Sequence, residues 1–574
     1  MKAKKHSSGN APLPLNPMLL LWLLPLAFLG VFYFYPLGNI LQLSLFWDDQ
    51  NALAAFWSSL TSAAAGNALK FTFQQAALST LFTLILGLPG AYLFARYQFK
   101  GKSMFRALMG VPFVMPTLVV AAGFNALLGP NGWVNSLLIE LFGFSSPPIH
   151  FINTFPAIII AHVFYNTTIV LRLVGDFWSH LNPRLNDASR VLGASPWKTF
   201  RTITLPLLSP AIAAASLLVF IFDFTSFGVV LILGGPQFST LEVEIYYQTI
   251  SLFNLPMAAT LSLLQLACTL LLTIAYTQLS KRMSRALPLS ARGRTQKTLR
   301  SWKEKLLAGL LILFLLSFLT LPLAALASRS LIDLSTPSGS PPRLTTTFYQ
   351  ALTRQPQQAL FYTPPIFALR TSLLYAGITV LLGLALGLPA AWALSREDSS
   401  PLNQILDPLI MLPLGTSAVT LGLGFIVSLD RPPLNLRTSP LLLPLAHTLV
   451  AFPFVVRSLT PALKSIQPRL HRAAAVLGAS PFQVFRQIDL PLIGRALIVS
   501  ASFAFMISIG EFGASSLITR PENPTVPVVI YRFLSRPGAL NYGQAMALST
   551  ILMLATLISM LTMEHFRMGD IGEF

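Results

Sequence analysis

Two acidic side chains lie inside long apolar stretches of this chain, and they are the first candidates for chemistry. Asp223 comes 17 residues after Pro206, and Glu511 comes 20 residues after Pro491. A carboxylate within a membrane is costly unless it is paired or hydrated, which makes it a candidate functional residue. The chemistry that it offers is attraction of a cation. The alternative is that each acid is neutralised by a helix neighbour or reaches the outer interface, and the sequence leaves both possibilities open.

The chain repeats itself, and the repeat places a serine opposite each acid. Residues 183–207 and 468–492 are identical at 16 of 25 positions without a gap, at an interval of 285 residues. At the same interval, Asp223 aligns with Ser508 and Glu511 aligns with Ser226. We therefore predict an acidic but asymmetric pathway lined by these four residues. The repeat-related His162 and His447 follow alanine in apolar runs, and structural hydrogen bonding is the favoured role for them.

Nucleotide and metal chemistry are not expected in this chain. A phosphate-binding P-loop needs a glycine five residues before its Gly-Lys-Ser. The one such triplet, which ends at Ser103, has Arg96 in that place. The single cysteine, Cys268, permits neither an internal disulfide nor a cysteine-based metal site. We predict no catalytic residue, no metal and no cofactor here, so any ATP hydrolysis must occur on another subunit.

The composition is that of a membrane protein. Apolar residues make up 54% of the chain and charged residues 10%, whereas soluble domains average about 25% charged. Several uncharged stretches exceed the roughly 20 residues that cross a bilayer as a helix. We predict an all-α polytopic membrane protein with about twelve transmembrane helices. They fall near residues 18–40, 68–95, 107–128, 153–171, 207–234, 257–279, 306–327, 367–395, 405–429, 438–456, 492–519 and 543–563.

The net charge of +19 does not indicate nucleic acid, because its distribution follows the positive-inside rule. Lysines and arginines fill the N-terminus, the loop 96–106 and the segment 281–305, whereas the loops 129–152 and 235–256 contain no Lys or Arg. This alternation predicts a multi-pass plasma-membrane protein with both termini in the cytoplasm. The second half fits less well, because six arginines would lie outside: Arg329, Arg343, Arg354, Arg520, Arg532 and Arg536.

An earlier stretch also repeats, and it defines two halves. Leu86-Gly-Leu-Pro89 matches Leu386-Gly-Leu-Pro389, so each half contains about six spans. Six is an even number, which gives both halves the same direction and a pseudo-twofold axis along the membrane normal. We predict a first domain over 1–280, a basic cytoplasmic linker over 281–305 and a second domain over 306–574. A pathway would run between the two halves.

The duplicated segment has the local signals of two short helices joined by a corner. Gly193 can take the left-handed conformation that ends a helix, and Ser195 is a natural N-cap before Pro196. Leu205-Pro206 then begins the next span, where a proline loses no hydrogen bond. The second copy has the same signals at Gly478 and Leu490-Pro491. A simple connector that re-enters the membrane would have little need for such close duplication.

The duplicated segment resembles the EAA loop of ABC-importer permeases. In that family a Glu-Ala-Ala triplet precedes a glycine and a later Ile-x-Leu-Pro, and the loop docks on an ATP-hydrolysing subunit. The resemblance implies docking roles for residues of both copies: Asp187, Ala188, Gly193, Leu205, Pro206, Arg472, Ala473, Gly478, Leu490 and Pro491. Asp187 keeps the charge of the family glutamate, whereas Arg472 reverses it. The two docking sites are therefore expected to be unequal.

The whole chain is similar to the two-domain permeases of ferric-iron and thiamine importers. The similarity lies in Ser226-Phe-Gly228, in Gly234-Gly-Pro236 with the following Glu242 to Tyr246, and in Ser508 to Gly513. It implies two parallel six-helix repeats in the type I ABC importer permease fold and a cationic cargo, thiamine or ferric iron. The implied partners are two copies of an ATPase that carries ATP and Mg²⁺, and an extracytoplasmic binding protein at 235–256 and 520–542.

A twelve-helix secondary transporter driven by an ion gradient is the main alternative. Such proteins also have two six-span halves. They carry an Asp-Arg-x-Gly-Arg-Arg pattern after the second span, whereas this chain has Arg96-Tyr-Gln-Phe-Lys-Gly-Lys-Ser103 there. The loop therefore favours the ABC permease.

Overall fold

The computed structural model describes residues 17–46, 52–182, 184–284, 296–333, 343–354, 364–396, 401–430 and 434–567. Within these ranges nine helices are long and apolar enough to cross a membrane, or up to twelve if each sharply bent pair counts as one span. A helix pairs its own backbone N–H and C=O groups. A chain segment inside a bilayer needs this, because no water is there to bond these groups. The predicted all-α membrane protein with about twelve spans is confirmed.

The elements follow the repeat along the chain. The first repeat contains α1 (Pro17–Leu29), η1 (Gly30–Phe34), α2 (Tyr35–Leu45), α3 (Ala52–Leu60), α4 (Ala63–Arg96), β1 (Tyr97–Gln98), α5 (Lys102–Leu108), α6 (Val111–Val114), α7 (Thr117–Leu128), α8 (Trp133–Phe142), α9 (Phe155–His180), α10 (Arg184–Val191), α11 (Pro196–Thr199), η2 (Phe200–Thr204), α12 (Leu205–Phe224), η3 (Val230–Gly234), η4 (Gly235–Gln237), α13 (Leu241–Ile250) and α14 (Leu255–Ser284). The second contains α15 (Trp302–Arg329), β3 (Ile332–Asp333), β4 (Arg343–Leu344), α16 (Thr347–Thr353), α17 (Phe367–Arg396), α18 (Pro401–Met411), η6 (Leu412–Gly415), α19 (Ala418–Ser428), α20 (Leu442–Lys464), α21 (Pro468–Val476), α22 (Pro481–Val484), η7 (Phe485–Asp489), α23 (Leu490–Leu492), α24 (Gly494–Gly510), α25 (Gly513–Ile518), α26 (Val526–Leu534) and α27 (Ala539–Arg567).

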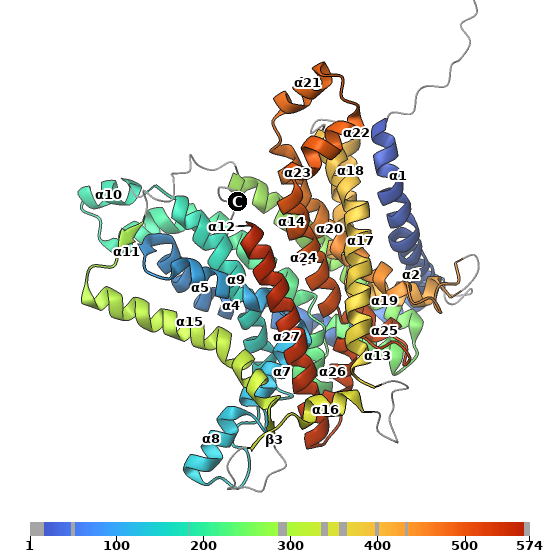
Figure 1. The fold of residues 1–574 in the computed structure, drawn as a ribbon. Helices are drawn as coiled ribbons and strands as arrows, with labels where there is room; N and C mark the ends of the chain where they lie inside the picture. Colours follow the sequence, from blue (N-terminus) through green and yellow to red (C-terminus); the bar gives the residue numbers. More distant parts are fainter. Residues whose placement is uncertain are drawn as a thin grey trace, which may run out of the picture.

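The first helix of each repeat packs against the other repeat. In Figure 1, α1 lies beside the late helix α17, and α15 lies beside the early helices α4 and α7. Trp22 and Leu29 of α1 share one core with Phe425 and Phe452 of the second repeat. The Tyr33 hydroxyl bonds across to Thr416 at 2.7 Å. The two sequence halves therefore exchange a helix.

Several predicted spans are broken where the sequence suggested continuous helices, including those expected over 107–128 and 405–429, and two of the breaks lie at the predicted acids. The helix expected over 207–234 ends at Phe224, and the one expected over 492–519 is interrupted between Gly510 and Gly513. Side chains satisfy the backbone groups that such breaks release. Gln75 donates to the carbonyl oxygen of Asp223 at 2.6 Å, and the Glu511 carboxylate accepts from the N–H of Ala514 at 2.8 Å. Both predicted acids thus lie at helix ends.

Short strands connect the two repeats at the linker. β1 pairs in parallel with the two-residue strand β2 (Lys297–Thr298), which the sequence did not predict. Residues 285–295 of the predicted basic linker lie outside the described ranges. β3 and β4 pair antiparallel, near α16 in Figure 1.

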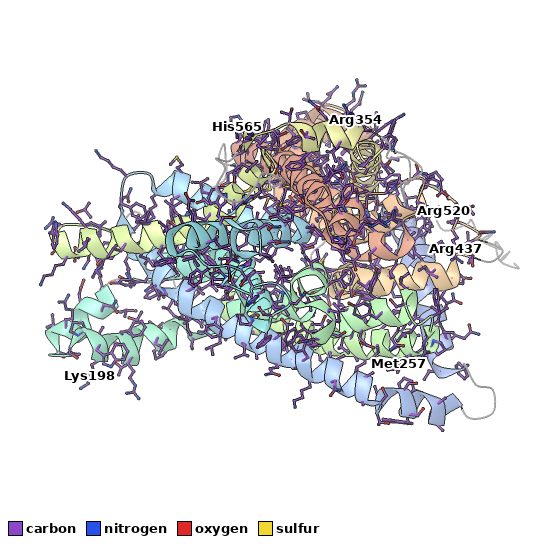
Figure 2. The ribbon with its side chains drawn as sticks, turned by 90° about the horizontal axis from the view of Figure 1, so that it is seen from below. Lys198, Met257, Arg354, Arg437, Arg520 and His565 are labelled. Carbon is purple, nitrogen blue, oxygen red and sulfur yellow. The ribbon has the colours of Figure 1, made fainter. Side chains whose placement is uncertain are left out.

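The arginines that depart from the positive-inside pattern are accommodated in different ways. Figure 2, seen from below, shows Arg354 and Arg520 at the rim of the second repeat, where both are exposed. Arg329 is instead buried and donates to the Ser136 hydroxyl on α8 at 2.7 Å. An arginine can therefore be kept in water or given a polar partner.

Candidate functional site

The first copy of the duplicated segment forms the predicted corner. Gly193 has φ +80°, a left-handed conformation that side-chain-bearing residues rarely adopt. The N–H of Ala194 reaches back to the carbonyl of Ser189 at 3.1 Å, which is the long bond of a Schellman motif. Ser195 then caps α11 by accepting from the N–H of Lys198 at 3.3 Å. The two short helices are fixed at an angle by these bonds.

The second copy has the same geometry. Gly478 has φ +77°, and the N–H of Ala479 reaches the carbonyl of Ala474 at 3.0 Å. Ser480 accepts from the N–H of Gln483 at 3.3 Å, and the Gln483 side chain accepts from the N–H of Ser480 at 2.7 Å. In Figure 1, α10 and α21 lie at the end of the molecule opposite α8 and α16. Both corners therefore point to the same side.

Each corner presents a matched apolar patch to solvent. The patch consists of three large side chains at repeat-related positions, namely Val191, Leu192 and Trp197 in the first copy and Val476, Leu477 and Phe482 in the second. Their exposed fractions range from 69% to 87%. Isolated exposed apolar residues are ordinary, but a contiguous patch marks an interaction surface. The predicted residues Asp187, Ala188, Arg472 and Ala473 are exposed on the same two helices.

A side-chain bond joins each of the helices α10 and α21 to the π-helical turn before the next span. In the first copy, the Thr204 hydroxyl of η2 donates to the Asn186 side-chain oxygen at 3.2 Å. In the second, His471 Nε2 lies 2.6 Å from Asp489 Oδ1 of η7. Asn186 is the repeat mate of His471, and Thr204 is the repeat mate of Asp489. The same link is therefore a neutral pair in the first copy and an ionisable pair in the second. Leu205-Pro206 and Leu490-Pro491 directly follow these turns, at the starts of α12 and α23.

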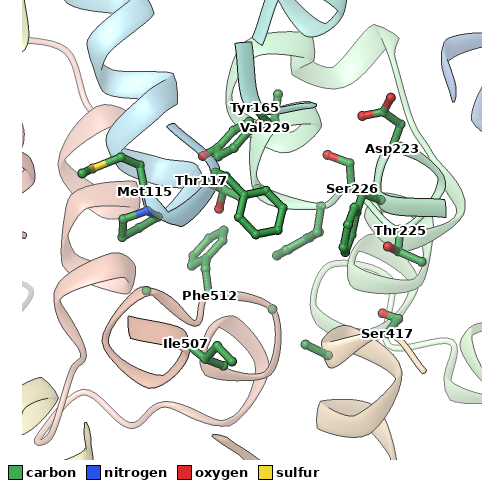
Figure 3. Close-up of a pocket in the computed structure, with 18 of the residues that line it drawn as sticks. Met115, Thr117, Tyr165, Asp223, Thr225, Ser226, Val229, Ser417, Ile507 and Phe512 are labelled. Atoms are coloured by element: carbon green, nitrogen blue, oxygen red, sulfur yellow. The ribbon is translucent and has the colours of Figure 1, made fainter. Parts of the chain in front are cut away.

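A cavity of about 430 Å³ lies between the two repeats. Figure 3 shows Asp223, Thr225 and Ser226 on one side of it and Met115 on the other, with Phe512 between them. The volume is in the range of small-molecule pockets. Aromatic side chains from both repeats form much of the wall: Phe113, Tyr165, Phe222, Phe227, Phe454, Phe503 and Phe512. Two of the four predicted pathway residues, Asp223 and Ser226, line this cavity.

Asp223 is buried at the cavity wall with one oxygen occupied. Its Oδ1 accepts from the Asn166 side chain at 2.6 Å and lies 3.6 Å from His162 Nδ1. Its Oδ2 has no hydrogen-bond partner among the described residues. The other ring nitrogen of His162 lies 2.7 Å from the Ser226 hydroxyl. The predicted hydrogen-bonding role of this histidine is therefore confirmed.

The other two predicted pathway residues lie around His447. Its Nδ1 is 2.8 Å from the Ser508 hydroxyl, and its Nε2 is 3.2 Å from the Glu511 carboxylate. Glu511 also accepts from the backbone N–H of Ala514 and Ser515 at 2.8 and 3.0 Å, and from the Ser515 hydroxyl. The cavity lining passes through Gly510, Phe512 and Gly513, directly around this residue.

Sequence reasoning missed an aromatic contact between the repeats. Phe227 stacks on its repeat mate Phe512 with ring centroids 5.2 Å apart. Tyr246 hydrogen-bonds to its repeat mate Tyr531 through their side chains, and each tyrosine packs on the phenylalanine of its own half. Residues near a pseudo-twofold axis lie close to their own repeat mates. The 285-residue interval, which pairs Phe227 with Phe512, could therefore have predicted this contact.

Glu242 is a third buried acid at the cavity, and it was not among the predicted site residues. Its carboxylate accepts from Gln265 of α14 at 2.8 Å and from Ser417 of the second repeat. Burial raises the pKa of Glu242 from its ordinary value of 4.5 to about 8, against the lowering effect of these two hydrogen bonds. In the described residues, no group of three or more His, Cys, Asp or Glu could hold a metal ion.

Comparison with known proteins gives a family match over both repeats. The family described as "Binding-protein-dependent transport system inner membrane component" matches residues 84–285 and 383–567. The chain is 27% identical over 519 residues to the thiamine transport system permease protein ThiP of Escherichia coli, covering 87% of this chain and 89% of that protein. The corresponding protein of Haemophilus influenzae is 28% identical over 470 residues, with coverage of 81% and 82%.

Two further similarities complete the comparison. A probable ABC transporter permease protein of Sinorhizobium fredii is 27% identical over 519 residues, which covers 88% of each chain. Among solved structures, a bacterial ABC transporter that imports alginate matches with a TM-score of 0.40 and 19% identity, over 47% of this chain and 96% of that chain.

Proposed function

Because this chain belongs to the family of binding-protein-dependent transport system inner membrane components, and is the permease subunit of an ABC importer, we propose that its cargo is thiamine. Relatives named as thiamine permeases match it over more than four fifths of their length. Thiamine is an organic cation with two aromatic rings, and a cavity with an acid and aromatic walls suits such a molecule. Ferric iron is the second cargo, and an ion-gradient transporter is not favoured by the family.

The energy for transport comes from a separate ATPase in this proposal. The observation that carries it is the matched apolar patch on both corners, at the same end of the molecule. Two copies of one ATPase would each bind one patch, with the exposed Asp187 or Arg472 at the edge. ATP and Mg²⁺ would be bound on that partner. The opposite charges of Asp187 and Arg472 would make the two contacts unequal.

A binding protein would deliver the cargo at the opposite end of the molecule. Residues 235–256 and 520–542 are the proposed contact, on the extracytoplasmic side of a bacterial plasma membrane, with both termini in the cytoplasm. Closure of the ATPases would move α10 and α21. The links at η2 and η7 would pass this movement to α12 and to α23–α24, whose far ends reach the cavity. The halves 1–280 and 306–574 would then rock about the cavity.

Uptake of labelled thiamine at nanomolar concentration tests the cargo. We expect saturable uptake by cells that carry the gene and its loss on deletion, with recovery from a plasmid copy. An ATPase subunit should copurify with the tagged chain in the same cells. Unchanged uptake after deletion would overturn thiamine as the cargo, and uptake of labelled ferric iron would then be measured in the same strains.

The docking proposal is tested by the double variant Gly193→Asp, Gly478→Asp. A Cβ at either position meets open space, so the substitution creates no clash, but aspartate strains the left-handed backbone and adds charge beside the patch. We expect normal membrane insertion and at least about a ten-fold loss of uptake, equivalent to about 1.4 kcal/mol of coupling. Asparagine tolerates the left-handed conformation better, so the matched Gly→Asn variant should retain more uptake. Normal uptake by a stably inserted aspartate variant would contradict docking.

A further inference from the structure

The two repeats contain the same polar cradle with its acid and serine exchanged. In each repeat a buried histidine has one repeat-related side chain near Nδ1 and another near Nε2. A further serine lies beside each ring, Ser79 at 3.2 Å from His162 Nδ1 and Ser515 at 3.1 Å from His447 Nε2. His162 has Asp223 near Nδ1 and Ser226 near Nε2. His447 has the mate of Asp223, Ser508, near Nδ1 and the mate of Ser226, Glu511, near Nε2. The exchange places one carboxylate in each cradle, at different positions.

The position of each carboxylate decides how many hydrogen bonds it accepts from the protein. Glu511 lies in the break between α24 and α25, where it accepts from two backbone N–H groups of the following turn. His447 and the Ser515 hydroxyl complete its surroundings. A carboxylate with both oxygens engaged in this way acts as a helix cap, because it satisfies donors that the break would otherwise leave unpaired. Glu511 is therefore held by the fold.

The carboxylate of Asp223 is only half engaged. Asn166 donates a hydrogen bond to Oδ1, whereas Oδ2 has no hydrogen-bond partner among the described residues. The residue is nevertheless buried, with 1% of its surface exposed. A buried polar atom without a partner is costly, and it calls for a group that completes it. The cavity that Asp223 lines opens onto aromatic walls from both repeats. The group that completes this site is then a cation inside the cavity.

We propose that this cavity is a cargo-binding site within the membrane, in which Asp223 contacts the positively charged aromatic ring of an organic cation while Glu511 serves the fold alone. The inference rests on the proposed function and names the residue that receives the cargo. The aromatic rings of Phe222, Phe227 and Phe512 line the site. Aromatic rings attract a cation, which makes this lining suitable for a charged cargo. Asn166 orients the carboxylate, and His162 holds Ser226 beside it.

The test compares the two acids in the complete transporter, with its ATPase and binding protein, in proteoliposomes. Asp223→Asn keeps an oxygen for Asn166 and removes the charge. We expect uptake of subsaturating labelled thiamine to fall at least about ten-fold, because the buried carboxylate that faces the thiazolium charge is lost, while the binding protein still stimulates ATP hydrolysis. Glu511→Gln should lower the thermal stability of the complex but leave the half-saturating thiamine concentration within about two-fold.

A second variant keeps the inference falsifiable if Asp223→Asn inserts poorly. Asp223→Ser, Ser226→Glu gives the first cradle the arrangement that the second cradle already adopts. It should insert and hydrolyse ATP, but it should lose uptake as Asp223→Asn does, because the new carboxylate is engaged by His162. Normal uptake by either variant would overturn the inference and leave the thiamine proposal standing.

The opposite failure is also distinguishable. If the wild-type transporter imports no thiamine, the proposed cargo is wrong, and binding of N-methylthiazolium to the nucleotide-free complex then decides the inference. Binding that Asp223→Asn weakens at least about ten-fold would support the cavity as a cation site. Equal binding by wild type and Asp223→Asn, or no binding by either, would overturn it.

Discussion

Glu242 lies where the two repeats meet, and its environment shows how one residue links them. It accepts a hydrogen bond from Ser417, at the N-terminus of α19 in the second repeat, and another from Gln265 in the first. Ser417 itself accepts from the N–H groups of Val419 and Thr420. Burial with few donors disfavours the charged carboxylate, which is why its pKa is raised to about 8. The neutral acid fits this site better than the anion does.

This environment predicts a pH-dependent effect of Glu242→Gln. A carboxyl group whose pKa is raised on folding lowers stability as pH rises from its unfolded value of 4.5, and the penalty is complete above about 8. Glutamine keeps an acceptor for Gln265 and carries no charge. The variant should therefore melt at a higher temperature than wild type at pH 8.5, with the difference shrinking towards pH 5. Melting curves of the purified chain at several pH values measure this, and a difference that does not vary with pH would contradict it.

At the scale of the element, the broken helices and the π-helical turns carry the features that function needs. In an unbroken helix the backbone groups near Asp223 and Glu511 would bond within the helix. The breaks leave some of these groups unpaired, and side chains satisfy them: Gln75 bonds the carbonyl of Asp223, and Glu511 bonds the N–H of Ala514. The two π-helical turns η2 and η7 occupy repeat-related positions directly before α12 and α23. Such turns often mark functional positions within helices. Here each turn receives a side-chain link, from α10 in the first repeat and from α21 in the second.

The His471–Asp489 link predicts that its loss will weaken the coupling between ATP hydrolysis and transport. His471→Ala removes the bond to the buried Asp489, which should weaken the second corner by about 1–3 kcal/mol. We expect fewer thiamine molecules imported per ATP hydrolysed, with insertion and basal ATP hydrolysis retained. The double variant His471→Asn, Asp489→Thr copies the Asn186–Thr204 pair of the first corner and should restore the ratio. A double variant no better than His471→Ala would show that the link does not transmit movement.

At the scale of the whole molecule, the exchange of α1 and α15 makes the two halves depend on each other. α1 contributes Trp22 and Leu29 to the core of the second repeat, and α15 contributes Leu315 and Leu319 to that of the first. Core burial of large apolar side chains stabilises a fold by about 1.5–3 kcal/mol each, and within a membrane the corresponding gain comes from packing. The stacked Phe227 and Phe512 and the bonded Tyr246 and Tyr531 add contacts across the axis.

This exchange predicts that cutting the linker leaves an assembled protein. A protease site inserted after Leu289 should yield two fragments that stay together, because each has a helix embedded in the other. A tag on the C-terminus should recover the N-terminal fragment from detergent after cleavage. Separate elution of the fragments would contradict the exchange, and a fragment of 1–280 expressed alone should accumulate poorly compared with the coexpressed pair.

Much of the fold could be predicted because its signals can be read directly from the order of the residues, without knowledge of their contacts. Bilayer thickness sets the length of apolar runs, the 285-residue repeat is visible without any structure, and a left-handed glycine with a serine cap is a short-range pattern. These signals predicted the spans, the two halves and both corners at Gly193 and Gly478. They also identified Asp223 and Glu511, since a carboxylate in an apolar run is conspicuous.

Only the tertiary structure decided which partners these residues have. Helix exchange depends on packing between segments hundreds of residues apart, and apolar periodicity does not specify a partner. The breaks at Phe224 and Glu511 depend on side chains such as Gln75, which satisfy a carbonyl from a distant helix. The same long-range contacts give Glu511 a full set of donors and leave one oxygen of Asp223, a residue that lines the cavity, without a partner among the described residues. The sequence shows only two acids in a repeat and cannot reveal this difference.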